Sequence, residues 1–168
     1  MSQWFETKVK YDTIDLGTGA MKAVSEPYLV DALSFTEAEA RITEEIEPFV
    51  KGEFQVTAVK KVRYDDVFYS EGGDRWFRVK INMITIDEKS GAEKRTASFA
   101  LVQAAEFKEA LDTFLEGMKG VLFDYEIVSI NETQLMDVLQ ADLGESLADR
   151  RAKKEALNQA QAEAEKAE

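Results

Sequence analysis

A segment of the chain recurs 72 positions later, and this repeat restricts the possible folds more than any other feature. The segment TIDLGTGAMK begins at Thr13, and TIDEKSGAEK begins at Thr85. Across positions 4–38, 15 of the 35 residues are identical to the residue 72 positions later, whereas unrelated segments would share about two. The sequence therefore predicts an internal duplication, with halves at about 4–69 and 76–140.

Each half has the same order of predicted elements. An alternation of apolar and polar residues indicates a half-buried strand, and Asp15 and Gly19 are typical of the turn that follows it. A second strand leads to Ser34, which begins a capping box and hence a helix. The predicted strands lie at 4–14, 22–32 and from 54 in the first half, and at 76–86, 94–104 and from 123 in the second; the helices end at about 47 and 118. Short fourth strands are expected within 65–69 and 133–140.

These elements predict an α+β fold with a duplicated ββαβ unit. A sheet with one helix leaves its other face bare, and a second copy can cover that face or extend the sheet. We expect one domain over 1–140, in which two antiparallel sheet-plus-helix halves are related by a pseudo-twofold axis. The segment 141–168 is rich in Ala, Glu, Lys and Gln, which predicts a charged helical or disordered tail.

The chain contains no cysteine and no histidine. This excludes disulfides, thiolate catalysis and Cys-ligated zinc, and it removes the commonest general base and transition-metal ligand. We recognise no nucleophile–base pair, calcium loop or phosphate loop, so we expect no catalytic residues, no metal and no cofactor. No signal sequence is evident, and no apolar run approaches the ~20 residues of a membrane span, so we expect a cytoplasmic protein without membrane contact.

The first strand of each half carries tryptophan and cations on the face opposite its apolar side chains. Such a face is typical of sheets that bind single-stranded nucleic acid, because the bases stack on the aromatic rings and the cations contact the phosphates. It is also consistent with a surface for a protein partner. We favour a third interpretation, in which the tryptophans pack between the halves and the cations prevent edge-to-edge aggregation, so we expect Trp76 to be buried. The third strand of the first half adds Lys61 and Arg63, which we expect on the same face. The candidate residues are therefore Trp4, Lys8, Lys10, Lys61, Arg63, Trp76, Arg78 and Lys80.

Four repeated carboxylates could in principle act in catalysis or metal binding. Asp15 and Asp87 stand at predicted turns, where an aspartate can accept hydrogen bonds from the backbone ahead of it. Glu37 and Glu109 stand in the first turn of the predicted helices, where the helix dipole favours acidic residues. These local roles explain all four, and we expect no further function for them.

Four segments of the chain together resemble segments of a known family: WFETKV from Trp4, YLVDALSFTEAEA from Tyr28, RWFRVK from Arg75 and ALVQAAEFKEAL from Ala100. They resemble the domain of unknown function 4494 family of bacterial and viral proteins over about residues 3–140. The resemblance implies that the chain is a complete member. That family has no assigned activity, so the resemblance transfers no site residues, and its occurrence in viruses leaves a phage-encoded origin open.

The missing catalytic residues beside a well-specified fold predict a non-enzymatic binding or adaptor protein with a protein partner of unknown identity. The alternative is a single-stranded nucleic-acid-binding protein that uses the tryptophan and cation face. A weaker alternative follows from the net charge of −12, which could let the protein imitate DNA and inhibit a DNA-binding enzyme. The sequence does not determine the oligomeric state.

Overall fold

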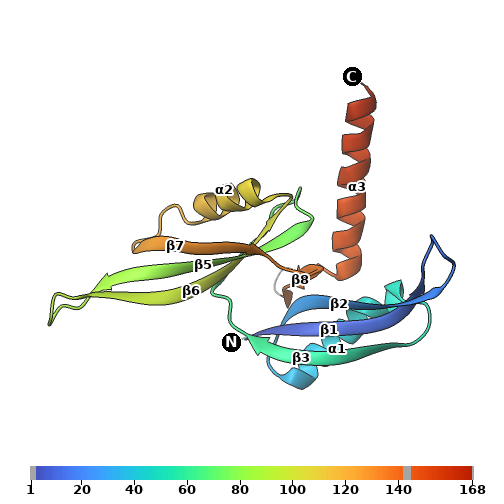
Figure 1. Cartoon of the computed structure of the whole chain (residues 1–168), viewed down its shortest axis with the longest axis horizontal. Helices are drawn as coiled ribbons and strands as arrows, with labels where there is room; N and C mark the ends of the chain where they lie inside the picture. Colours follow the sequence, from blue (N-terminus) through green and yellow to red (C-terminus); the bar gives the residue numbers. More distant parts are fainter. Residues whose placement is uncertain (1–2, 142–144, 168) are drawn as a thin grey trace. The chain divides into compact units, whose positions relative to one another are not determined.

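The structure is a computed structural model that describes residues 3–141 and 145–167. Within these residues, two four-stranded sheets each carry a helix on one face, so the chain has the predicted α+β fold (Figure 1). The contacts divide the chain into two units. Unit 1 comprises Met1–Val62 and Gln134–Glu168, and unit 2 comprises Arg63–Thr133.

Unit 1 contains a sheet with the strand order β3-β1-β2-β8, in which β1 pairs antiparallel with β2 and β3 while β8 pairs parallel with β2. Its helix α1 packs on one face because alternate residues of β1, such as Phe5 and Val9, are apolar and meet Ala38 and Ile42 of the helix. The elements are β1 Gln3–Ile14, β2 Met21–Ala32, α1 Phe35–Ile46, the 3-10 helix η1 Glu47–Phe49, β3 Phe54–Val62, β8 Asp137–Leu139 and α3 Leu147–Lys166.

Unit 2 contains a sheet with the order β4-β6-β5-β7, and the pairing follows the same scheme as in unit 1. Phe77 and Val79 of β5 pack against Ala110 and Phe114 of α2. The elements are β4 Asp66–Phe68, β5 Arg75–Ile86, β6 Glu93–Ala104, α2 Phe107–Gly117 and β7 Asp124–Glu132. The two units therefore share one order of elements and one register, although the duplication and the pseudo-twofold axis stay predictions.

The short strands exchange partners between the predicted halves. β4 follows β3 along the chain, but it pairs with β6 of unit 2, where Val67 lies opposite Leu101. β8 follows β7, but it pairs with β2 of unit 1, where Val138 lies opposite Leu29. Each sheet is thus completed by a strand from the other half of the chain. The prediction of a single domain over 1–140 stays a prediction.

The residues that predict turns and helix caps form these structures. Gly19 and Gly91 adopt φ values of 73° and 70° at the ends of the two hairpin turns, where a residue with a Cβ atom would be strained. The Ser34 side chain accepts a hydrogen bond from the backbone of Glu37 at the start of α1. The segment after residue 141, of which residues 145–167 are described, includes helix α3. Among the described residues, no helix is both long and apolar enough to span a membrane.

Candidate binding surfaces

The first strand of unit 1 places three of the candidate residues on the sheet face opposite α1. Lys8 and Lys10 are exposed and Trp4 is partly buried. They share this face because Phe5 and Val9, which alternate with them, pack against α1. The predicted separation of the two faces of β1 is therefore correct.

Lys61 and Arg63 do not join this group. The pairing of β1 with β3 shifts between Lys8 and Val9, where Thr57 forms a bulge. An extra residue in one strand reverses its alternation beyond the bulge, so Lys61 lies opposite Phe5, on the α1 side. Arg63 belongs to unit 2, where its guanidinium lies 3.4 Å from the Asp65 carboxylate.

Unit 2 brings two of its three candidate residues together beside an aromatic ring. Arg78 and Lys80 lie on the face of β5 opposite α2, and Lys80 pairs across the strands with Phe99 of β6. The Arg78 guanidinium carbon is 4.4 Å from the centre of the Phe99 ring, and the Lys80 Nζ is 6.0 Å from it. The sequence interpretation missed Phe99; its position opposite a repeated lysine was the available signal.

Trp76 is on the same face of β5, but only 1% of its surface is exposed. Its ring meets that of Tyr69 edge to face, with 5.3 Å between the ring centres. The expectation that Trp76 is buried is confirmed. Trp76 is therefore not available to stack on a nucleic-acid base in this structure, and the repeated position in unit 1, Trp4, is only partly exposed.

The four repeated carboxylates have the local roles expected of them. The backbone N–H groups of Gly17 and Lys89 donate to Asp15 and Asp87 at 2.8 and 2.9 Å. Glu37 accepts a hydrogen bond from the Leu33 N–H at 3.1 Å, and Glu109 accepts one from the Ala105 N–H at 3.3 Å. Within the part of the chain that the structure describes, no three acidic side chains gather in a way that could hold a metal ion.

A polar cluster beneath α1 in unit 1 was not predicted. The hydroxyls of Tyr11 and Tyr28 each donate to the Glu26 carboxylate at 2.7 Å, and the Arg151 guanidinium donates to the Tyr28 oxygen at 2.8 Å. Burial and the hydrogen bond to Glu26 raise the pKa of Tyr11 to about 12, and the same causes raise the pKa of the fully buried Tyr28. The Arg151 guanidinium also lies 4.0 Å from the ring centre of Phe49.

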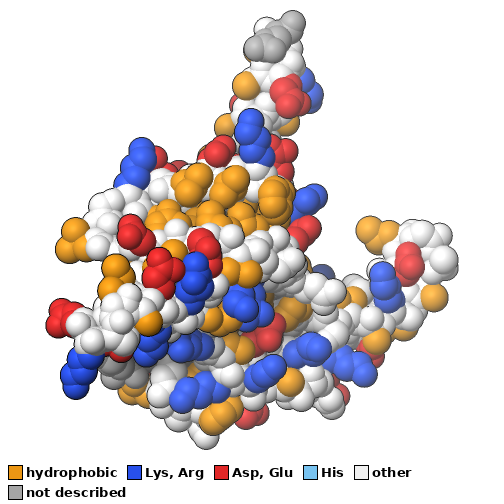
Figure 2. All heavy atoms as spheres, turned by 60° about the vertical axis from the view of Figure 1, so that its left-hand side comes forward, with side chains coloured by type: hydrophobic (Ala, Val, Ile, Leu, Met, Phe, Trp, Pro, Cys, Tyr) orange, Lys and Arg blue, Asp and Glu red, His pale blue; other side chains and the backbone are white. Residues whose placement is uncertain are grey.

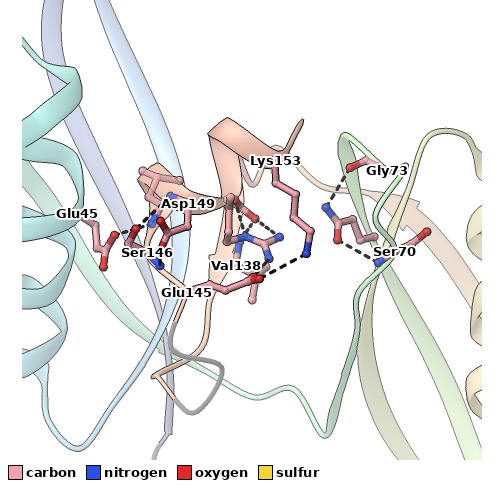
Figure 3. A network of polar contacts seen from close by, with 12 residues as sticks. Glu45, Ser70, Gly73, Val138, Glu145, Ser146, Asp149 and Lys153 are labelled. Carbon is pink, nitrogen blue, oxygen red and sulfur yellow. Dashed lines mark hydrogen bonds and ion pairs between the residues drawn. The ribbon is translucent and has the colours of Figure 1, made fainter. Parts of the chain in front are cut away.

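This cluster, through Arg151, and neighbouring contacts of Leu147 and Arg150 anchor helix α3 to the rest of unit 1. Leu147, which begins the helix, is 1% exposed within the core, and its N–H donates to Glu45 at 2.6 Å (Figure 3). Arg150 forms two hydrogen bonds of 2.8 Å with the Asp137 carboxylate of β8. Beyond this anchor nearly all of the helix is exposed. The cluster therefore has a structural role, since it fixes the first turns of α3.

Large apolar side chains are exposed at the tip of the β1–β2 hairpin. Ile14 and Met21 lie opposite each other with 60% and 69% of their surface exposed, and Leu16 in the turn is fully exposed. The tip of the β5–β6 hairpin differs, because Glu88 and Glu93 stand at the positions of Leu16 and Met21. On the face shown in Figure 2, many hydrophobic side chains gather in one area, and basic side chains lie below it with acidic ones among them.

The chain was compared with known proteins. Residues 3–141 match the family described as Domain of unknown function (DUF4494). A comparison with curated proteins finds no match.

Proposed function

The chain belongs to the DUF4494 family, and we propose that it is a non-enzymatic adaptor that binds a protein partner. The exposed apolar tip of the β1–β2 hairpin supports this proposal. A turn needs glycine and a capping aspartate, and Asp15 and Gly19 supply both, so the fold gives no reason for leucine at position 16. An exposed group of apolar side chains is typical of a surface that another protein covers.

The geometry of the tip fits an anchor that inserts into a partner. Ile14 and Met21 are cross-strand neighbours, so their side chains project from the same side of the hairpin, next to Leu16. The Asp15 N–H donates a hydrogen bond of 2.8 Å to the Ala20 carbonyl, and this bond holds the turn in one conformation. A pre-organised apolar anchor loses little conformational entropy when it binds.

Affinity purification of the full-length protein from its native cell tests the proposal. We expect a partner in stoichiometric amount with the wild type and its loss with the variant Leu16→Ser/Met21→Ser. Both side chains are exposed, so the variant should fold normally.

Ile86→Ser is the matched control, because Ile86 occupies the position of Ile14 on the other hairpin and is 69% exposed. This variant should keep the partner. Absence of a stoichiometric partner with the wild type, together with turnover of a screened metabolite, would refute the adaptor function. Equal loss of the partner with both variants would show that the β1–β2 tip is not the contact.

Two other functions stay proposals. The first is binding of single-stranded nucleic acid. Trp76 is buried and cannot stack on a base, so the support for this function comes from Arg78 and Lys80 beside Phe99. Imitation of DNA rests on the net charge alone.

A further inference from the structure

We propose that the face of the unit 2 sheet opposite α2 binds single-stranded nucleic acid at a site made by Arg78, Lys80 and Phe99. This site has a different ligand and a different location from the apolar hairpin tip, so it goes beyond the protein contact proposed above. Four observations support it: the cations lie beside an aromatic ring, they form no ion pair with a carboxylate among the described residues, polar side chains border them, and the corresponding positions of unit 1 lack this combination.

The two cations flank one aromatic ring. The Arg78 guanidinium lies 4.4 Å from the centre of the Phe99 ring, and the Lys80 ammonium lies 6.0 Å from it. Strand pairing fixes this arrangement, because Lys80 lies opposite Phe99 and Arg78 lies two residues away on the same face. Bases stack on aromatic rings and on guanidinium planes, and cations beside them contact phosphates.

Arg78 and Lys80 are available for an anionic ligand. Among the described residues, neither side chain forms an ion pair with a carboxylate. Glu126, a nearby acidic residue on the same face, is already held by Arg95 at 3.0 Å and by Asn82 at 3.3 Å. Asp65 accepts hydrogen bonds from the Phe99 N–H and the Ser98 hydroxyl, and it also pairs with Arg63. The carboxylates at the border of the site are therefore engaged elsewhere.

Polar side chains continue the face next to the cations. On β7, Ser129 lies opposite Lys80 and Asn131 lies opposite Arg78. A hydroxyl and an amide can donate to phosphate oxygens and to base edges without adding a fixed charge. The site thus extends over three neighbouring strands, which suits a strand of several nucleotides better than a single small anion.

The corresponding positions of unit 1 lack this combination. Lys8 lies opposite Pro27 instead of a phenylalanine, and Glu6 stands in place of Arg78. Glu6 also lies opposite Lys60 on β3. Because the two sheets have the same register, the aromatic ring with two cations is a property of the unit 2 sequence and does not follow from the shared fold.

The two cations and the aromatic ring together determine which class of ligand fits the site. Two cations beside a ring attract both a phosphate backbone and an acidic peptide, but only a nucleic acid also offers planar bases for stacking on the ring and the guanidinium. A double helix keeps its bases stacked inside, so the ligand is a single strand. The ring is partly exposed, as stacking requires.

Fluorescence anisotropy with the full-length protein and a labelled oligothymidine of about 15 nucleotides, the upper range for one binding fold, tests the proposal. We expect binding that weakens as salt is added. Arg78→Gln and Lys80→Gln should each weaken binding and reduce the salt slope by about 0.7, as for one phosphate contact on a single strand. Phe99→Leu should weaken binding roughly 5- to 150-fold, as for the loss of one stacked base.

Lys60→Gln removes the same charge from the unit 1 sheet and serves as the control; it should leave binding unchanged. Far-UV circular dichroism shows whether each variant is folded, and if Phe99→Leu unfolds, the salt slopes of the two cation variants decide. No binding at low salt, or an equal loss with Lys60→Gln, would overturn the proposal. Displacement of the oligonucleotide by poly-glutamate at equal charge concentration would also overturn it and would indicate an acidic protein ligand.

Discussion

Trp76 is the largest fully buried side chain of the described residues, and its environment predicts a large effect on stability. Truncation of a buried tryptophan leaves a cavity, so Trp76→Ala should lower the free energy of unfolding by about 3–5 kcal/mol. Trp4→Ala should cost less, because Trp4 is only partly buried. Denaturant unfolding measures both. A Trp76→Ala midpoint near that of the wild type at unchanged slope would contradict the buried role and restore the ring as a binding residue.

The raised pKa of Tyr11 predicts that the protein loses stability at alkaline pH. Its pKa rises from 10.0 to about 12 on folding, so the folded state holds the hydroxyl proton more tightly than the unfolded state. The stabilising contribution is complete below pH 10 and disappears as the pH rises from 10 to 12. Tyr11→Phe removes this titration, so its stability should fall less steeply over that interval in urea unfolding. Parallel curves for the two proteins would show that Tyr11 does not contribute.

Residue-level predictions from the sequence were accurate where a local rule applies. The caps at Ser34 and Asp15 are formed because their hydrogen-bond partners lie within a few residues. Lys61 was assigned to the wrong face because a bulge leaves no clear mark in a single sequence. Phe99 was missed because its role depends on Arg78 and Lys80 of another strand, which only the register brings near.

Helix α2 ends at Gly117 against the exchanged strand β4. A Cβ atom at this position would lie 2.7 Å from the Phe68 ring, so Gly117→Ala forces the ring to move. The overpacking should destabilise the protein by about 1–3 kcal/mol and exceed the gain of about 1 kcal/mol from better helix propensity. Thermal unfolding measures the balance.

Gly72→Ala is the control for this substitution, because a Cβ atom there has open space around it. It should leave stability nearly unchanged. A Gly117→Ala protein as stable as the control would mean that β4 does not pack against α2 as described.

At the scale of elements, periodicity and turn residues define the strands well. The expected strand 76–86 corresponds to β5 at Arg75–Ile86, since its alternation is regular and Asp87 begins a turn. The short strand β8 was expected, but its partner was not. Pairing between Val138 and Leu29 joins residues that are more than one hundred positions apart, and no local pattern specifies it.

Across the whole molecule, the exchange of short strands makes each unit depend on both halves of the sequence. Leu139 of β8 and Leu147 of α3 are fully buried in the core of unit 1, although they follow unit 2 along the chain. An isolated first half would lack both side chains and the edge strand. Each half of the sequence thus supplies an edge strand to the sheet that the other half forms.

Backbone nuclear Overhauser effects in the full-length protein test this exchange most directly, because β8 can pair with only one sheet. The structure predicts contacts between the backbone protons of Val138 and Leu29 and between those of Val67 and Leu101. Contacts between Val138 and Leu101, with Val67 next to Leu29, would instead place each short strand in the sheet of its own half and would contradict the account.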